Sequence, residues 1–493
     1  MNRISLILIT LLISLEMYSQ NFGEFPKITK EKLHRDLDLL YQGLNKFHSG
    51  MYWYTSKDSV DLAFQKAKIE ISKDLNVLEY HKIIAPLVAL SREDHTDIFL
   101  PKNIKNEIFN NENIKYLPLI VKFLGKKLYC IRNASDNPIK IDTLEIESIN
   151  GETPIQIVSK IGNLFASDGY IKTLKYEDFS GFGFSRYHYY YYGLISNYEI
   201  KFKKIPNLIS LRSSSIKQIN ETLKKYVNVN KEESNSAPLK FEIINSKTAY
   251  LDIQTFSNDI IKSKSEFKTL NNFLENCFSE IKEKNIKNVI IDVSKNGGGT
   301  EGNEGLLYSY FGDNYQKYLK VRAKTQKVVL DNGIDKPIKL KVYGLLERIF
   351  TNTKMQDGSL ERKKNFGLGL MAYKKTPKNQ FKGKIYVIIG PITYSGGSEF
   401  SNMMYSRNLA TFIGQETGGG YLGNTSGYGR NLTLPNSKIT IEIPALQFVM
   451  NVRPILPFGS GVKPHHEVIP TITQHINNEN VNLNYALKLI NEK

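Results

Sequence analysis

KIYVIIGPITYSGGSEF, residues 384–400, is the stretch around which this chain is organised. Its apolar and aromatic run Ile385 to Ile389 predicts a buried strand, and Gly390-Pro391 ends that strand. Ser395 then stands where the strand stops and a helix begins. Unpaired backbone N–H groups at a helix start can face an oxyanion, so the position suits a nucleophile. It equally suits an ordinary N-cap serine, and the stretch alone leaves both interpretations open.

Length and charge limit the class of protein. A chain of 493 residues is too long for one core of usual size, so about two to four domains are expected. The net charge of +17 would permit binding to nucleic acid or to an anionic surface. The lysines are spread along the chain without a dense basic block. We therefore expect a solvated surface with at most peripheral contact to an anionic envelope surface, and no nucleic-acid partner.

The first residues, 1–20, have the pattern of a secretory signal peptide. Arg3 precedes an apolar run that extends to Leu15, and small residues follow near Ser19. The run is shorter than the ~20 residues that a membrane span needs. The sequence therefore predicts an exported protein of the periplasm or the extracellular space. Cys130 and Cys277 lie far apart among apolar neighbours, which indicates buried free thiols rather than a disulfide or metal site.

Changes in hydrophobic period divide the rest of the chain. Residues 21–110 carry three helical patterns and end the third at SREDHT. Residues 111–205 alternate like strands, and the aromatic run SRYHYYYYGL within them favours a half-buried strand over a ligand-stacking surface. Residues 206–236 are rich in Ser, Asn and Lys and read as a linker.

A third region, residues 237–493, begins with a β-α-β pattern that predicts a sheet covered by helices. Its second strand leads into Gly297, Gly298 and Gly299. Residues 325–380 are irregular, and a loop of this size beside a site is typical of a lid.

Acyl transfer by a serine needs a nucleophile, a base and donors aimed at the developing oxyanion. Ser395 can be the nucleophile, the Gly396 N–H one donor, and the triple glycine the source of another. Three glycines after a strand are also an ordinary tight turn. No Gly-Lys-Ser/Thr follows them, which argues against a bound nucleotide.

Few histidines could serve as the base. His95 stands at a predicted helix end between Asp94 and Thr96, from which its side chain can project into a cleft. His465 and His466 could bind a metal, but adjacent histidines rarely chelate one ion unaided and no Glu-x-x-His pattern supports them. We expect neither a metal nor an organic cofactor.

These pieces, in this order, resemble the tail-specific, or C-terminal-processing, serine peptidases. The resemblance rests on DHT after the N-terminal helices, EIESINGETP, VIIDVSKNGGG, TYSGGSE, GQETGGG and LPFGSGVKP, and it spans nearly the whole chain after the signal peptide. It implies an α/β fold with a crotonase- and ClpP-like mixed α/β catalytic core, an N-terminal helical bundle and a PDZ-like domain. EIESINGETP looks like the PDZ-like segment.

Two branches of the family differ in the base. One has a lysine in the turn after the nucleophile, where this chain has Gly420. The other, similar to the tricorn core and to interphotoreceptor retinoid-binding protein, takes a histidine from a His-Thr motif, and His95 matches it. The resemblance therefore implies Ser395 as nucleophile and His95 as general base. Gly396, with Gly298 or Gly297, would donate to the oxyanion.

One departure from the family pattern concerns the residue that orients the histidine. Relatives often read Glu-Gly-x-Gly where this chain has Phe458-Gly459-Ser460-Gly461. Glu442 and Glu467 are the candidates that remain for an orienting carboxylate. Together with the predicted signal peptide, the resemblance predicts an exported serine peptidase that cleaves peptides or proteins near their C-termini. The alternative is a catalytically inactive binding protein that keeps the fold and holds a hydrophobic ligand or peptide, and a third hypothesis is a PDZ-like scaffold.

Overall fold

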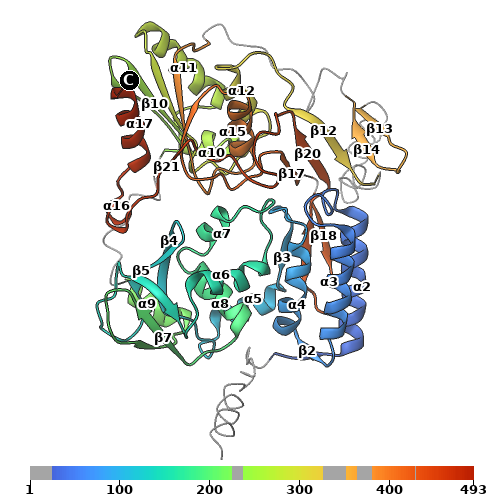
Figure 1. The fold of residues 1–493 in the computed structure, drawn as a ribbon. Coiled ribbons are helices and arrows are strands. Elements are labelled where there is room, and N and C mark those ends of the chain that lie inside the picture. Colours follow the sequence, from blue (N-terminus) through green and yellow to red (C-terminus); the bar gives the residue numbers. More distant parts are fainter. Residues whose placement is uncertain (1–24, 225–236, 326–350, 364–379, 428, 493) are drawn as a thin grey trace, which may run out of the picture.

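The computed structural model of the protein describes residues 25–224, 237–325, 351–363, 380–427 and 429–492. The predicted signal peptide, most of the predicted lid and the last part of the predicted linker lie outside these residues. Figure 1 shows three regions: blue helices, a blue-green to green sheet with its helices, and a region coloured yellow-green to red that lies mostly above both. No helix within the described ranges is long and apolar enough to cross a membrane.

The N-terminal region is helical, as its leucine spacing predicts. Its long helices are α2 (Lys30–Phe47), α3 (Lys57–Glu70) and α4 (Val77–Ala89). Leucines of α2 three or four residues apart are buried against the other two helices, which gives this region its own apolar core. The shorter elements are β1 (Lys27–Ile28), β2 (Leu75–Asn76), β3 (Asp97–Phe99) and α5 (Lys102–Asn110). His95 therefore lies in the short connection between α4 and β3.

The middle region contains an antiparallel sheet in the order β4-β5-β6-β7-β8. The strands are β4 (Leu119–Leu124), β5 (Lys127–Asn133), β6 (Glu145–Ile149), β7 (Asn197–Phe202) and β8 (Ile209–Arg212). The helices are α6 (Pro154–Ile161), the 3₁₀ turn η1 (Gly162–Leu164), α7 (Thr173–Asp178), α8 (Gly183–Tyr192) and α9 (Ile216–Lys224). Because β8 and α9 belong to this region, it extends into the stretch predicted as a linker.

The aromatic run predicted as a strand is instead the helix α8. This helix lies between two cores, so it buries side chains on more than one face. Tyr189 and Tyr190 pack into the core of the N-terminal helices, whereas Phe184 packs into the core of the middle sheet. The β-propensity of tyrosine is outweighed by this packing, because propensity is a weak preference that tertiary contacts override.

The third region is built on a six-stranded sheet in the order β21-β16-β15-β11-β10-β9. All neighbouring pairs are parallel except β9 with β10. The strands are β9 (Leu239–Asn245), β10 (Thr248–Ile253), β11 (Asn288–Asp292), β15 (Lys384–Ile389), β16 (Thr411–Gly414) and β21 (His466–Glu467). The predicted mixed α/β core is confirmed, and its β-α-β unit is β10, helices α10 and α11, and β11.

Helices cover both faces of this sheet, so its central strands are buried. They are α10 (Asn258–Lys264), α11 (Leu270–Glu283), α12 (Asn303–Ser309), α15 (Gly396–Ser406), α16 (Ile472–Ile476) and α17 (Val481–Asn491). A second sheet has the order β13-β14-β12-β20-β17. Its strands are β12 (Tyr318–Ala323), β13 (Asn352–Lys354), β14 (Leu360–Arg362), β17 (Gly423–Ser426) and β20 (Leu446–Met450).

A hairpin from the third region reaches the N-terminal helices (Figure 1) and fixes the segment that carries His95. It consists of β18 (Arg430–Thr433) and β19 (Thr440–Ile443), and β19 pairs with β3 so that Glu442 lies opposite Asp97. The loop between the hairpin strands is held by Asp36 of α2. The buried Asp36 carboxylate accepts hydrogen bonds from the backbone N–H groups of Asn436 and Ser437 at 3.1 and 2.7 Å.

Candidate active site

Ser395 occupies the turn between β15 and α15 in a backbone conformation that few residues adopt. Its φ is 48° and its ψ is −123°, outside the regions that are comfortable for a side chain with a Cβ. Among the described residues, its side chain makes no cap hydrogen bond to α15, although Ser395 precedes that helix. Its carbonyl oxygen instead accepts from the Glu399 N–H at 2.9 Å and from the Ser398 hydroxyl at 2.8 Å. The described structure therefore does not support the capping interpretation of Ser395, and its hydroxyl group is available to act as a nucleophile.

The turn is held rigidly by the neighbouring strand β11 and the loop that follows it. The buried Thr393 hydroxyl donates to the Val293 carbonyl at 2.8 Å and accepts from the Gly390 N–H at 3.0 Å. The Tyr394 N–H donates to the Asn296 carbonyl at 3.0 Å. These bonds connect the nucleophile turn to the glycine-rich loop, which explains how the turn keeps its unusual backbone angles.

The glycine-rich loop lies directly against Ser395. A Cβ placed on Gly298 would stand 2.8 Å from the Ser395 Cβ and 3.1 Å from its Oγ, so only glycine fits there. The Gly298 N–H already donates to the Asn296 side-chain oxygen at 2.9 Å. Within the described part of the chain, the N–H groups of Gly396 and Gly297 have no hydrogen-bond acceptor. Of the three predicted donors, these two are therefore the ones available to an oxyanion.

His95 reaches the same turn from the N-terminal region. Its Nδ1 lies 2.8 Å from the hydroxyl of Tyr394, the residue before Ser395, and the two rings stack with centroids 5.0 Å apart. Burial lowers the pKa of His95 to about 4, against an opposing influence of the Glu399 carboxylate. The imidazole is therefore neutral at pH 7, which is the form that a general base requires.

Carboxyl groups surround this histidine segment. The Asp94 N–H donates to one oxygen of Asp168 at 2.9 Å, and the Gly420 N–H donates to the other at 3.1 Å. Glu93, which is fully buried, accepts from the Thr425 N–H at 2.7 Å. Burial, followed by the charge of Asp168, raises the pKa of both Glu93 and Asp94 well above the usual carboxyl range. All three regions of the chain therefore contribute to the surroundings of His95.

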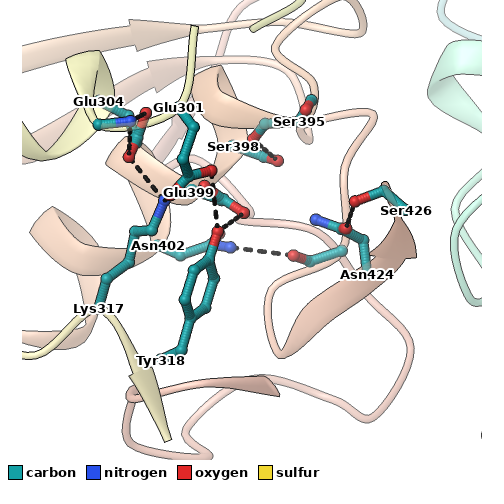
Figure 2. Close-up of polar contacts among 12 residues, drawn as sticks. Glu301, Glu304, Lys317, Tyr318, Ser395, Ser398, Glu399, Asn402, Asn424 and Ser426 are labelled. Carbon is teal, nitrogen blue, oxygen red and sulfur yellow. Dashed lines mark hydrogen bonds and ion pairs between the residues drawn. The ribbon is translucent and has the colours of Figure 1, made fainter. Parts of the chain in front are cut away.

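On the other side of the turn, three carboxylates converge on one buried ammonium group (Figure 2). The Lys317 Nζ lies 2.5 Å from Glu301, 2.6 Å from Glu304 and 2.9 Å from Glu399. The Tyr318 hydroxyl also donates to Glu399, at 2.8 Å. These carboxylates have the spacing of a metal site, but the ammonium group occupies its centre. Through Glu399 the cluster anchors the first turn of α15, which begins at Gly396.

The other residues predicted for the site lie elsewhere. Glu442 faces Asp97 across the β19–β3 pair, and Glu467 lies in β21 at the edge of the large sheet. Neither is among the described contacts of His95. The predicted metal-binding alternatives have structural partners: His465 accepts from the Phe412 N–H at 2.9 Å, and the His466 Nδ1 lies 3.2 Å from the Tyr485 hydroxyl.

The sequence motifs did not indicate four residues of the site: Tyr394, Asp94, Asn296 and Lys317. Tyr394 and Asp94 directly precede Ser395 and His95, so their positions next to the proposed catalytic pair were the available signal. Asn296 precedes the triple glycine and could have been read as the side chain that closes this turn. Nothing in the sequence around Lys317 indicates that its ammonium group is buried among carboxylates.

The third region matches a known protein family in sequence, and the whole chain is similar to solved structures in fold. Residues 247–468 match the sequence profile of peptidase family S41. Among solved structures, the chain is similar to mature CPAF complexed with lactacystin, with a TM-score of 0.58, 15% identity, and coverage of 94% of this chain and 99% of that chain. A mutant of CPAF is similar with a TM-score of 0.58, 14% identity, and coverage of 90% and 94%. These identities show a shared fold and no more. No curated protein sequence matches the chain significantly.

Proposed function

Because the chain belongs to the tail-specific protease family, peptidase family S41, we propose that it is an active, exported serine peptidase that cleaves peptides or proteins near their C-termini. Ser395 is the nucleophile and His95 is the general base. The observation that carries the proposal is the meeting of two distant segments. His95 contacts Tyr394 at 2.8 Å, beside a serine whose φ is 48° and whose hydroxyl caps no helix in the described structure.

The chemistry divides into two acyl-transfer steps. The Ser395 Oγ attacks the carbonyl carbon of the scissile peptide, and the His95 Nε2 accepts the hydroxyl proton. The negative charge that develops on the carbonyl oxygen faces the N–H groups of Gly396 and Gly297. When the C–N bond breaks, His95 gives its proton to the leaving amine. Water then attacks the acyl-enzyme, with His95 as base again, and releases Ser395 and a new carboxylate.

Preference for C-terminal sites would come from the middle region. An antiparallel sheet with a helix beside it can bind an extended peptide by strand addition and hold its terminal carboxylate. The proposal predicts faster cleavage of peptides with a free C-terminus than of the same peptides with a terminal amide. Equal rates for the two forms would limit the proposal to a peptidase without this preference.

The catalytic assignment is tested by comparing wild type with Ser395→Ala and His95→Ala on a mixture of unstructured peptides. Each substitution should reduce kcat by at least about 10³-fold while the circular dichroism spectrum stays unchanged. Ser406→Ala is a matched control, because this buried serine lies at the other end of α15. If Ser395→Ala keeps full peptidase activity, Ser395 is not the nucleophile.

A second candidate function, an inactive binding protein, is favoured by one feature. Phe458, which stands where relatives carry a glutamate, is 51% exposed and contacts Tyr54 with ring centroids 5.1 Å apart. Trp53 in turn stacks on Tyr54 at 5.3 Å. This aromatic group could hold a hydrophobic ligand. Binding of an apolar fluorescent probe that Phe458→Ala abolishes, together with no detectable peptide cleavage, would support this candidate over the peptidase.

Export is part of the proposal and has its own test. Expression of the full chain in a Gram-negative host, followed by N-terminal sequencing of protein from the periplasmic fraction, should find an N-terminus close to Gln20. Recovery of full-length protein from the cytosolic fraction alone would contradict export and would leave the catalytic assignment untouched.

A further inference from the structure

Four aromatic side chains from three parts of the chain meet in one place, and we call them the aromatic surface: Trp53, Tyr54, Tyr170 and Phe458. The Tyr54 ring lies at its centre, with ring centroids 5.3 Å from Trp53, 6.2 Å from Tyr170 and 5.1 Å from Phe458. Tyr54 is buried, whereas Tyr170 and Phe458 are 50% and 51% exposed. A single exposed apolar residue is ordinary, but several exposed rings in one place are typical of a binding surface.

The exposed ring of Tyr170 is held in one position. Its hydroxyl donates to the Tyr54 carbonyl at 3.2 Å, and its backbone N–H donates to the Gly459 carbonyl at 2.7 Å. A Cβ on Gly459 would stand 2.5 Å from the Tyr170 Cδ2, so the backbone next to Phe458 packs directly against the ring. Because the ring is already fixed, little conformational entropy is lost when an apolar group binds to it.

The aromatic surface adjoins the nucleophile turn. A Cβ on Gly420 would stand 3.7 Å from the Tyr54 hydroxyl, and a Cβ on Gly419 would stand 3.3 Å from the Ser395 nitrogen. Gly419 and Gly420 are consecutive residues. A single turn of backbone therefore lies between the centre of the aromatic surface and the nucleophile.

The aromatic surface also adjoins the segment that carries His95. The Arg92 guanidinium lies over the Tyr170 ring, 4.5 Å from its centroid. Two residues before Tyr170, the Asp168 carboxylate accepts from the N–H of Asp94, the residue before His95, at 2.9 Å. The surface is thus continuous with both halves of the candidate active site. An extended peptide advances about 3.3 Å per residue, so residues close to the scissile bond of a bound peptide can reach it.

We propose that the aromatic surface is a substrate subsite that binds one aromatic or large aliphatic side chain of the peptide close to the scissile bond. The proposal deepens the peptidase assignment and rests on it. Phe458 and Tyr170 are the specificity-determining residues, because each offers an exposed part of its ring. A large apolar side chain that packs there removes apolar area from water on both partners, which a small side chain does not do.

The kinetic test uses peptides that differ at one residue, which is Phe, Leu or Ala, placed in turn at each position around the cleaved bond. Mass spectrometry of the products locates the bond. At one position kcat/KM for the Phe peptide should exceed that for the Ala peptide by about 10-fold or more, with Leu close to Phe. No preference at any position would overturn the subsite and leave Ser395 assigned as nucleophile.

Substitutions in the full chain assign this preference to the aromatic surface. Phe458→Ala and Tyr170→Ala should each lower the Phe-to-Ala ratio of kcat/KM at least about threefold, and Phe458→Leu should lower it less. A merely structural role would lower kcat/KM for both peptides alike and leave the ratio unmoved. Leu62→Ala is the matched control, because this leucine of α3 is also 51% exposed and lies outside the aromatic surface. An unmoved ratio in both alanine variants would overturn the proposal.

Tryptophan fluorescence separates this proposal from the peptidase assignment, because Trp53 is the only tryptophan of the chain and stacks on Tyr54. In Ser395→Ala, a peptide with one central 4-nitrophenylalanine should quench Trp53 emission saturably, with affinity at least about threefold weaker when Phe458→Ala is added. Equal affinity with and without Phe458→Ala would overturn the subsite. Saturable quenching together with no peptide cleavage by wild type would overturn the peptidase assignment, and the subsite with it, in favour of the binding-protein candidate.

Discussion

Removing the ammonium group of Lys317 should destabilise the catalytic region severely. The Lys317 side chain is 7% exposed, and two of its three carboxylate partners, Glu304 and Glu399, are 2% and 7% exposed. Burial opposes the charge of Lys317, but these carboxylates raise its pKa well above the usual lysine value. Lys317→Met keeps the length and the apolar stem of the side chain, so the loss it causes is mainly electrostatic.

The magnitude follows from the carboxylates left behind. Breaking a buried ion pair by removing one partner costs about 3 to 5 kcal/mol, because the other charge stays buried without compensation. For a unit of ~250 residues, each kcal/mol shifts Tm by about 2 to 4 °C, so Tm should fall by about 6 to 20 °C. Burial raises the pKa of Glu301 to about 7, and the charge of Lys317 opposes that rise. Without the ammonium group the Glu301 pKa should rise further above its value in the unfolded chain, so the deficit should shrink as the pH falls through about 7.

Differential scanning calorimetry of the full chain measures this effect, and Lys217→Met is the matched control. Lys217 pairs with Glu112 at 2.8 Å, but both side chains are about 60% exposed, and such surface pairs contribute about 0 to 1 kcal/mol. The double variant Lys317→Met/Glu304→Gln should recover part of the lost stability, since it removes one orphaned charge. If Lys317→Met melts within about 2 °C of wild type at neutral pH, the reasoning about this cluster is wrong.

Two further substitutions test other parts of the account. Gly298→Ala should lower the free energy of unfolding by at least about 1 kcal/mol and nearly abolish activity, because the φ of Gly298 is +95° and the new Cβ would collide with Ser395. The control is Gly151→Ala, at φ +81° with open space around it. It should lower the stability measured by calorimetry but leave the peptidase rate unchanged. Asp36→Ala should lower the free energy of unfolding, measured by urea titration, by about 3 kcal/mol. The substitution removes the carboxylate that accepts hydrogen bonds from two backbone N–H groups of the β18–β19 loop. Asp38→Ala, an exposed change on the same helix, should cost less than about 1 kcal/mol, and similar losses for the two aspartates would contradict that explanation.

The sequence predicted those parts of the fold that local patterns encode. One hydrophobic period runs through each of three segments, so the type of secondary structure could be predicted directly for them: the helix α2, the strand β15 and the β-α-β unit around α11. The run of tyrosines in α8 could not, because its conformation depends on two cores that meet only in the folded chain. The hairpin β18–β19 pairs with β3, which comes from a distant part of the sequence, and no local pattern encodes that pairing.

The sequence predicted only part of the candidate site, because local patterns again encode only some of its residues. Ser395 and His95 stand within motifs, whereas the groups that fix their positions are known only from contacts in the folded chain. Lys317 is one lysine among many until the fold surrounds it with carboxylates. The donor role first considered for Gly298 also changed with the structure, because the Asn296 side chain already accepts its N–H.

The central claim, that Ser395 is an activated nucleophile, is tested most directly by covalent labelling with a fluorophosphonate followed by intact mass and peptide mapping. We expect one adduct per chain, located on Ser395, with labelling slowed strongly in His95→Ala and absent in Ser395→Ala. A folded wild-type protein that takes up no label, or takes it up on a different serine, would contradict the account.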